Sequence, residues 1–161
     1  MYSLQMKDSM LDVLLYIYDN FFEQAKARTL EIKAVDLERI GFLPDEIAKA
    51  FAWLSSLTEN KFEFMALPSE RAIRVYSPYE TDKLSKPCVG LLVFLEHTKL
   101  IDPIIRETVM QLVIELDTED LGLEQFIRIV LMVLLNRSYQ EGAVSFLQQL
   151  LFVSNKDLIV H

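Results

Sequence analysis

Cysteine and histidine, which form disulfides and many metal sites, are nearly absent from this sequence. Its 161 residues include one cysteine, Cys88, and two histidines, His97 and His161. A single cysteine excludes an intrachain disulfide and favours a reducing, cytoplasmic setting. Cys88 and His97 fall on opposite sides of one expected helix, so they cannot form a nucleophile–base pair. We expect Cys88 to pack as a small buried residue, and we predict no metal site and no cofactor.

Glycine and proline are also scarce, with 4 and 5 residues. The glycines are isolated from one another, which excludes a glycine-rich phosphate-binding loop. No serine nucleophile elbow occurs either, and no catalytic residues are predicted. The longest apolar stretches, 88–95 and 126–135, fall far short of the ~20 residues needed to span a bilayer. The sequence therefore predicts neither an enzyme nor a membrane protein.

Positive charge is in short supply as well. The chain has 16 Lys and Arg against 24 Asp and Glu, a formal net charge of −8. This balance repels phosphate backbones at long range, because nucleic-acid-binding proteins usually carry a basic face. Direct nucleic-acid binding is therefore disfavoured, and the expected partner is a protein. The composition leaves open whether the chain forms a homo-oligomer.

Apolar residues, in contrast, are abundant: 52% of the residues are hydrophobic and the mean hydropathy is +0.22. Most of them recur at helical spacing. Gly41 should end a helix, because glycine accepts a left-handed C-cap, and Pro44 should start the next one. Asp102-Pro103 has the pattern of another helix start. The expected helices cover about 9–27, 34–40, 44–57, 78–85, 87–99, 103–116, 123–136 and 140–152, with a frayed end after residue 152.

One segment has a different period. Phe62 and Phe64 alternate with polar residues, as do Ile73 and Val75, which predicts a β-hairpin over this part of the chain. Three helices followed by a hairpin have the order of a winged-helix unit. The predicted fold is therefore mainly α with one small hairpin. It has a winged-helix-like unit at 1–77 packed on a five-helix bundle at 78–161, the two forming one compact unit.

Aromatic residues indicate where a partner could bind. Trp53, Phe62, Phe64 and Tyr76 cluster around the third helix and the hairpin, and exposed aromatics mark protein interfaces. The leading hypothesis is a non-catalytic protein-interaction or regulatory module that binds a partner at these residues or at the first helix. The alternative is a winged-helix protein that associates with nucleic acid within a larger assembly. The Ile40-Gly41-Phe42 turn also resembles that of ubiquitin-associated-like docking domains.

A resemblance to a known family covers almost the whole chain. It is carried by the segments 11–16, 40–42, 52–54, 73–80, 90–96, 115–118, 129–136 and 150–152. Together these segments resemble the bacterial Smg protein family. The resemblance implies a bacterial cytoplasmic protein, but no activity, cofactor or catalytic residues, because the family's function is unknown.

Overall fold

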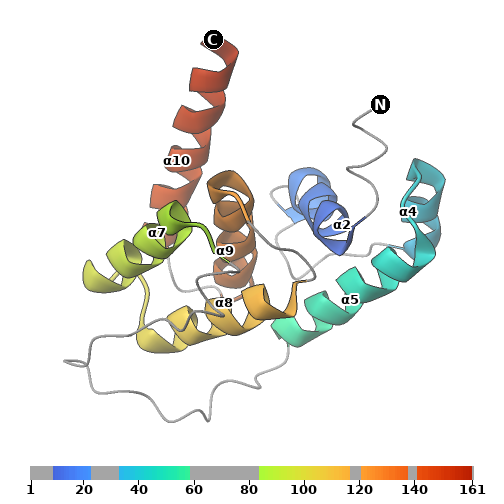
Figure 1. The fold of residues 1–161 in the computed structure, drawn as a ribbon, viewed down its shortest axis with the longest axis horizontal. Helices are drawn as coiled ribbons and strands as arrows, with labels where there is room; N and C mark the ends of the chain where they lie inside the picture. Colours follow the sequence, from blue (N-terminus) through green and yellow to red (C-terminus); the bar gives the residue numbers. More distant parts are fainter. Residues whose placement is uncertain (1–8, 23–32, 59–83, 117–120, 138–140, 161) are drawn as a thin grey trace.

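The computed structural model describes residues 9–22, 33–58, 84–116, 121–137 and 141–160. Figure 1 shows how its helices are arranged. In the first half, α2 (Met10–Ile17) continues into the π-helical turn η1 (Tyr18–Phe22), and α4 (Ala34–Ile40) and α5 (Pro44–Thr58) follow. The second half contains α7 (Lys86–His97), α8 (Pro103–Glu115), α9 (Leu123–Arg137) and α10 (Glu141–Val160).

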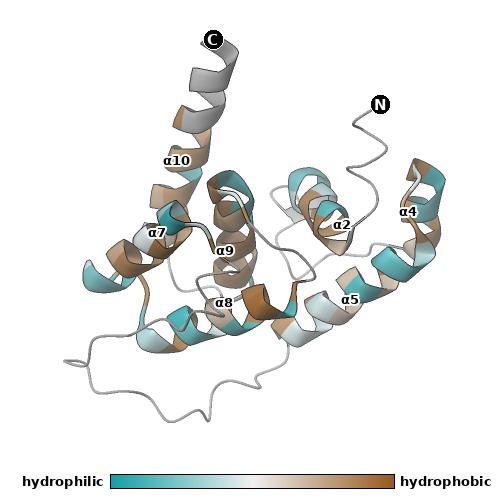
Figure 2. Cartoon of the chain, viewed as in Figure 1, coloured by the Kyte–Doolittle hydropathy of each residue, from teal (hydrophilic) through white to brown (hydrophobic). Residues whose placement is uncertain are grey.

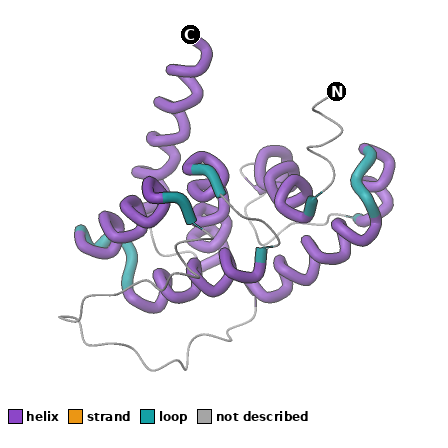
Figure 3. Tube along the Cα trace, viewed as in Figure 1, coloured by secondary structure: helices purple, strands orange, loops and turns teal. Residues whose placement is uncertain are grey.

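The predicted fold class is wrong in its β part. The described ranges contain helices and loops but no strand, as Figure 3 shows, and the hairpin positions 62–66 and 73–76 lie outside these ranges. The expected recognition helix, α5, packs against α2 on one side and contacts α8 and α9 of the second half. Alternation over a few residues is a weak signal, since tertiary contacts decide the conformation of such short segments. We therefore correct the fold class to helical, since the described residues contain no winged-helix unit.

Two helix boundaries also differ from expectation. Leu84 forms an isolated parallel bridge with Leu121, and Ser85 is the N-cap of α7, so these residues do not close a preceding helix. At the other end of the chain, α10 continues to Val160, eight residues beyond the expected end at Phe152. Its last turns extend away from the other helices (Figure 1). The proposed boundary at residue 77 stays a prediction, because it lies outside the described residues.

Helix α9 is the centre of the hydrophobic core. Every residue from Ile129 to Leu134 is buried, so this part of the helix has no solvent-facing side. This part of the helix is apolar on every side (Figure 2), and α9 as a whole contacts α2, η1, α5, α7, α8 and α10. A helix that is apolar on all sides must be covered on all sides, because its exposed surface would cost about 25 cal/mol per Å². The elements that contact α9 therefore enclose it, whereas α4 packs on α5.

The first helix contributes to the same core. Val13, Leu14 and Ile17 are completely buried, which makes α2 a central helix rather than half of an open interface. At its far end, Asp19 in η1 forms an ion pair with Arg128 of α9, with 3.0 Å between Oδ1 and Nε. Residues from both halves of the chain thus form one continuous hydrophobic cluster.

The turn between α4 and α5 confirms the role predicted for Gly41. Its φ angle is 121°, in a region that favours glycine. The Gly41 amide donates to the carbonyl of Glu38, and the Phe42 amide donates to the carbonyl of Leu37. This is a Schellman motif, and its usual apolar contact is supplied by Leu37 and Phe42, which are both buried. Phe42 also packs edge-on against Tyr16 of α2, with ring centroids 5.5 Å apart.

The turn yields a prediction with an internal control. Gly41→Ala should lower the free energy of unfolding by about 1–3 kcal/mol, because alanine is strained at this φ angle. Gly90→Ala should change it in the opposite direction, since Gly90 is helical and an added Cβ would meet no atom within 4 Å. Urea unfolding followed by circular dichroism measures both. Equal effects of the two substitutions would contradict the assignment.

Candidate functional site

Trp53 is the one predicted partner-binding residue within the described ranges, and it is a core residue. Its side chain is 2% exposed, and its Nε1–H donates a 2.8 Å hydrogen bond to the carbonyl of Leu112 in α8. Phe62, Phe64 and Tyr76 lie outside the described residues, so their part in an interface stays a prediction.

The carbonyl that Trp53 binds is available because α8 ends there. Leu116, which would bond Leu112 in a regular helix, donates instead to the carbonyl of Val113. The last carbonyls of a helix lack partners within it, and a buried one needs another donor. The indole supplies that donor and joins α5 to α8. Sequence periodicity placed Trp53 at the edge of an apolar face but could not identify this long-range partner.

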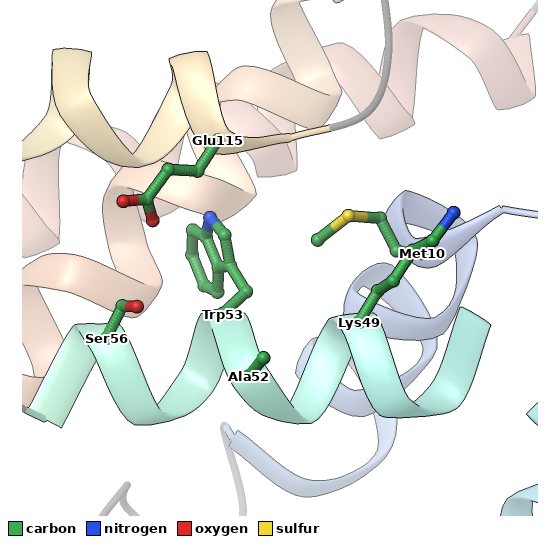
Figure 4. A pocket seen from close by; sticks show the side chains of 6 residues that line it. All are labelled: Met10, Lys49, Ala52, Trp53, Ser56 and Glu115. Atoms are coloured by element: carbon green, nitrogen blue, oxygen red, sulfur yellow. The ribbon is translucent and has the colours of Figure 1, made fainter. Parts of the chain in front are cut away.

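A small open pocket lies beside this contact. It has a volume of about 290 Å³ and is lined from three helices, α2, α5 and α8. In Figure 4 the Trp53 indole lies between the Glu115 and Ser56 side chains on one side and Met10 and Lys49 on the other. Met10 is also almost completely buried, so two residues of the lining are held by the core. The lining residues are Met10, Lys49, Ala52, Trp53, Ser56 and Glu115.

The rim of the pocket carries charge of both signs. The Lys49 amine lies 3.1 Å from a carboxylate oxygen of Glu46, one turn earlier on α5. Glu115 is exposed, and within the described part of the chain no hydrogen bond or ion pair involves its carboxylate. Three more acids follow it in the sequence, at 117, 119 and 120. The pocket thus combines an apolar lining with a carboxylate at its edge.

The pocket lining contains lysine, serine and glutamate but neither histidine nor cysteine. Among the residues that the structure describes, no three His, Cys, Asp or Glu side chains are grouped to hold a metal ion. Across the same residues, no helix combines the length and apolar character that crossing a lipid bilayer requires. The lining is suited to binding an apolar group.

Arg106 forms a second polar cluster, which the sequence patterns did not indicate. The guanidinium, on α8, is 1% exposed and forms ion pairs with Glu96 of α7 and with Glu107, the latter at 2.8 Å from Nε. Burial alone would lower the pKa of Arg106 by desolvating the cation, but the two carboxylates raise it above its ordinary value. The Nη2 atom is buried without a hydrogen-bond partner. An arginine at an apolar helix position is the only sequence signal that could have suggested this cluster.

Cys88 is buried, as predicted. Ser85 Oγ donates to its sulfur at 3.2 Å, and the thiol donates to the carbonyl of Leu121 at 3.4 Å. Burial raises the pKa of the Cys88 thiol above its ordinary value, although the hydrogen bonds from Ser85 act in the opposite direction. A raised pKa leaves little thiolate near neutrality, so this cysteine is poorly suited to be a nucleophile.

Comparison with known proteins identifies the family. The family model described as "Protein of unknown function (DUF494)" matches residues 10–161. A protein of Xanthomonas oryzae pv. oryzae named "Protein Smg homolog" is 34% identical over 154 residues, which is 94% of this chain and 98% of that protein. A Nitrosococcus oceani protein of the same name is 35% identical over 158 residues, covering 96% and 99% of the two chains. This chain therefore belongs to the DUF494 family, the Smg proteins. No solved structure matches it.

The Arg106 cluster predicts a non-additive mutant cycle. Glu96→Gln should cost about 2–3 kcal/mol of unfolding free energy, less than the 3–5 kcal/mol typical of breaking a buried pair, because Glu107 remains. Adding Arg106→Met removes the buried cation that has lost one of its two carboxylate partners and should recover part of that loss. Urea unfolding of the single and double variants measures the coupling. A double variant less stable than Glu96→Gln would contradict this account.

The Cys88 environment predicts slow thiol chemistry. The folded protein should react with Ellman's reagent much more slowly than a free cysteine, and unfolding in urea should restore normal reactivity. Because the pKa is raised, the labelling rate of the folded protein should keep increasing above the pH at which a free thiol reaches its plateau. A plateau at or below the ordinary thiol pKa would show that the sulfur is accessible and ionised.

Proposed function

We propose that this protein is a non-catalytic protein-interaction module whose pocket between α2, α5 and α8 receives one apolar side chain of a partner. The observation that carries the proposal is that two of the side chains lining the pocket are held in fixed positions. Trp53 is held by the core and by its hydrogen bond to Leu112, and Met10 is held by the core. A partner would therefore meet a rigid apolar surface, which lowers the entropy cost of binding.

The size of the pocket supports a side chain rather than a cofactor as its occupant. Pockets that bury small molecules usually measure about 300–1,000 Å³ and enclose most of the ligand. This one, at about 290 Å³, is at the lower limit and open to solvent. Anchor residues of protein interfaces, in contrast, insert single aliphatic or aromatic side chains into such sites.

Charge supports one kind of partner. The chain has a net charge of −8, and the exposed Glu115 carboxylate stands at the rim. The Lys49 amine is already close to Glu46, which lowers its value as a binding site for an acidic partner. The proposed partner segment therefore has a leucine-sized anchor flanked by Lys or Arg, and an amphipathic helix meets this requirement. Electrostatic complementarity of this kind steers association and selects the partner.

The sole tryptophan gives a direct test, because Trp53 lines the pocket and is the only intrinsic indole fluorophore. Three tryptophan-free helical peptides serve as probes: a leucine anchor flanked by Lys and Arg, the same anchor flanked by Glu, and the basic peptide with alanine as anchor. Only the first should change the Trp53 emission saturably. Ala52→Leu, which fills the pocket from exposed α5 surface, should weaken that binding by about tenfold or more.

Ala48→Leu is the matched control, since Ala48 is exposed on α5 but does not line the pocket. It should leave peptide binding unchanged. Circular dichroism should show that both variants keep their helices, because leucine is nearly as good a helix former as alanine. The proposal fails if the basic peptide leaves Trp53 emission unchanged, or if Ala52→Leu binds it as well as the parent protein does.

A further inference from the structure

The outward side of α7 forms a second apolar surface, separate from the pocket. Pro87, Gly90, Val93 and Phe94 are exposed there, Val93 at 47% and Phe94 at 45%. Helical spacing places them on one face, with Gly90 near its centre. From Pro87 to Phe94 the exposed residues of α7 carry no charge. This face is therefore unlike the rest of an acidic protein.

Gly90 has no function within the single chain that the structure describes. It lies in the interior of a helix, where glycine is less favourable than alanine. Its φ angle is not positive, so its backbone conformation suits other residues. An added Cβ would meet no atom within 4 Å, so internal packing does not require glycine either. The surface above Gly90 is therefore open to the close approach of another group.

Phe94 supplies a protruding group on the same face. Its ring packs against Phe146 of α10, with ring centroids 5.4 Å apart and planes at 31°, and this contact fixes its position. Phe94 follows Gly90 by one helical turn, so a projection and a gap lie next to each other. A surface with both is self-complementary under a twofold rotation, in which the same residues contact each other from both copies.

We infer that α7 pairs with α7 of a second copy of this chain. The two helices run antiparallel, and the Phe94 ring of each copy lies over Gly90 of the other. The twofold axis then passes at the level of Leu92, midway between these two residues. Gly90 leaves the room that the aromatic ring of the other copy requires.

If two copies associate, charge favours contact at this uncharged face rather than at the acidic remainder of the surface. A chain with a net charge of −8 repels its own copies, and an uncharged contact reduces that repulsion. The antiparallel arrangement brings the exposed Lys86 of one copy level with Thr98, the C-cap of α7, in the other. The negative end of the helix dipole favours a cation there, whereas the adjacent exposed Lys99 opposes it. A contact one helix wide is small, so the dimer should dissociate with a Kd in the micromolar range or weaker.

Sedimentation equilibrium from micromolar to millimolar protein tests the inference. The parent protein should fit a monomer–dimer equilibrium. Gly90→Gln should raise the dimer Kd by about tenfold or more, because the new side chain occupies the gap, while the fold is kept. Phe94→Gln should raise it similarly. The control Ala48→Gln adds the same side chain to exposed α5 surface and should leave the Kd unchanged.

Two results would overturn the inference: a parent protein that stays monomeric up to millimolar concentration, or a dimer whose Kd is unaffected by Gly90→Gln. The Gly90 variant removes no contact within the chain, so misfolding does not explain its effect. The inference does not rest on the proposed function. Ala52→Leu should weaken peptide binding and leave the dimer Kd unchanged. Gly90→Gln should raise the dimer Kd and leave peptide binding unchanged, so the two failures are distinguishable.

Discussion

The structure depends on the burial of α9. A helix with six consecutive buried residues, Ile129–Leu134, has no side that water can favourably contact, and it must be enclosed. Helices from both halves of the chain supply the cover, because neither half alone surrounds α9. The Asp19–Arg128 ion pair at the edge of this contact orients η1 but contributes little by itself, since surface pairs are worth about 0–1 kcal/mol.

Enclosing α9 also determines where the two proposed surfaces lie. The contact between α5 and α8 places Trp53 under the carbonyl of Leu112, and the pocket forms where α2 approaches the same two helices. On the other side, Arg106 bonds to Glu96 and holds α8 against α7, which leaves Pro87, Gly90 and Phe94 on the outside. The pocket and the α7 face are therefore both consequences of how the core is closed. They are separate surfaces, so one chain could bind a basic partner segment while it pairs with a second copy.

Much of the helical structure was predictable from local residues. Gly41 ended α4, Pro44 began α5, and Asp102 capped α8 through the amide of Ile105, all as expected. These signals are local, because a cap depends on backbone groups within one turn. The hairpin prediction failed for the converse reason, since a short alternating segment carries no information about what will pack on it. The family resemblance was also readable from the chain, and the comparisons confirmed it.

By itself the sequence determined that the chain is rich in helix, carries an excess of acid, buries its single cysteine and belongs to the Smg proteins. Each of these follows from composition, from spacing within a few turns, or from the order of residues along the chain. The tertiary structure decided that Trp53 lines a pocket from inside the core, that Arg106 is buried between two carboxylates, and that Gly90 faces open space. Those facts depend on contacts between residues far apart in the chain, such as Trp53 with Leu112. Local periodicity contains no information about which distant groups will meet.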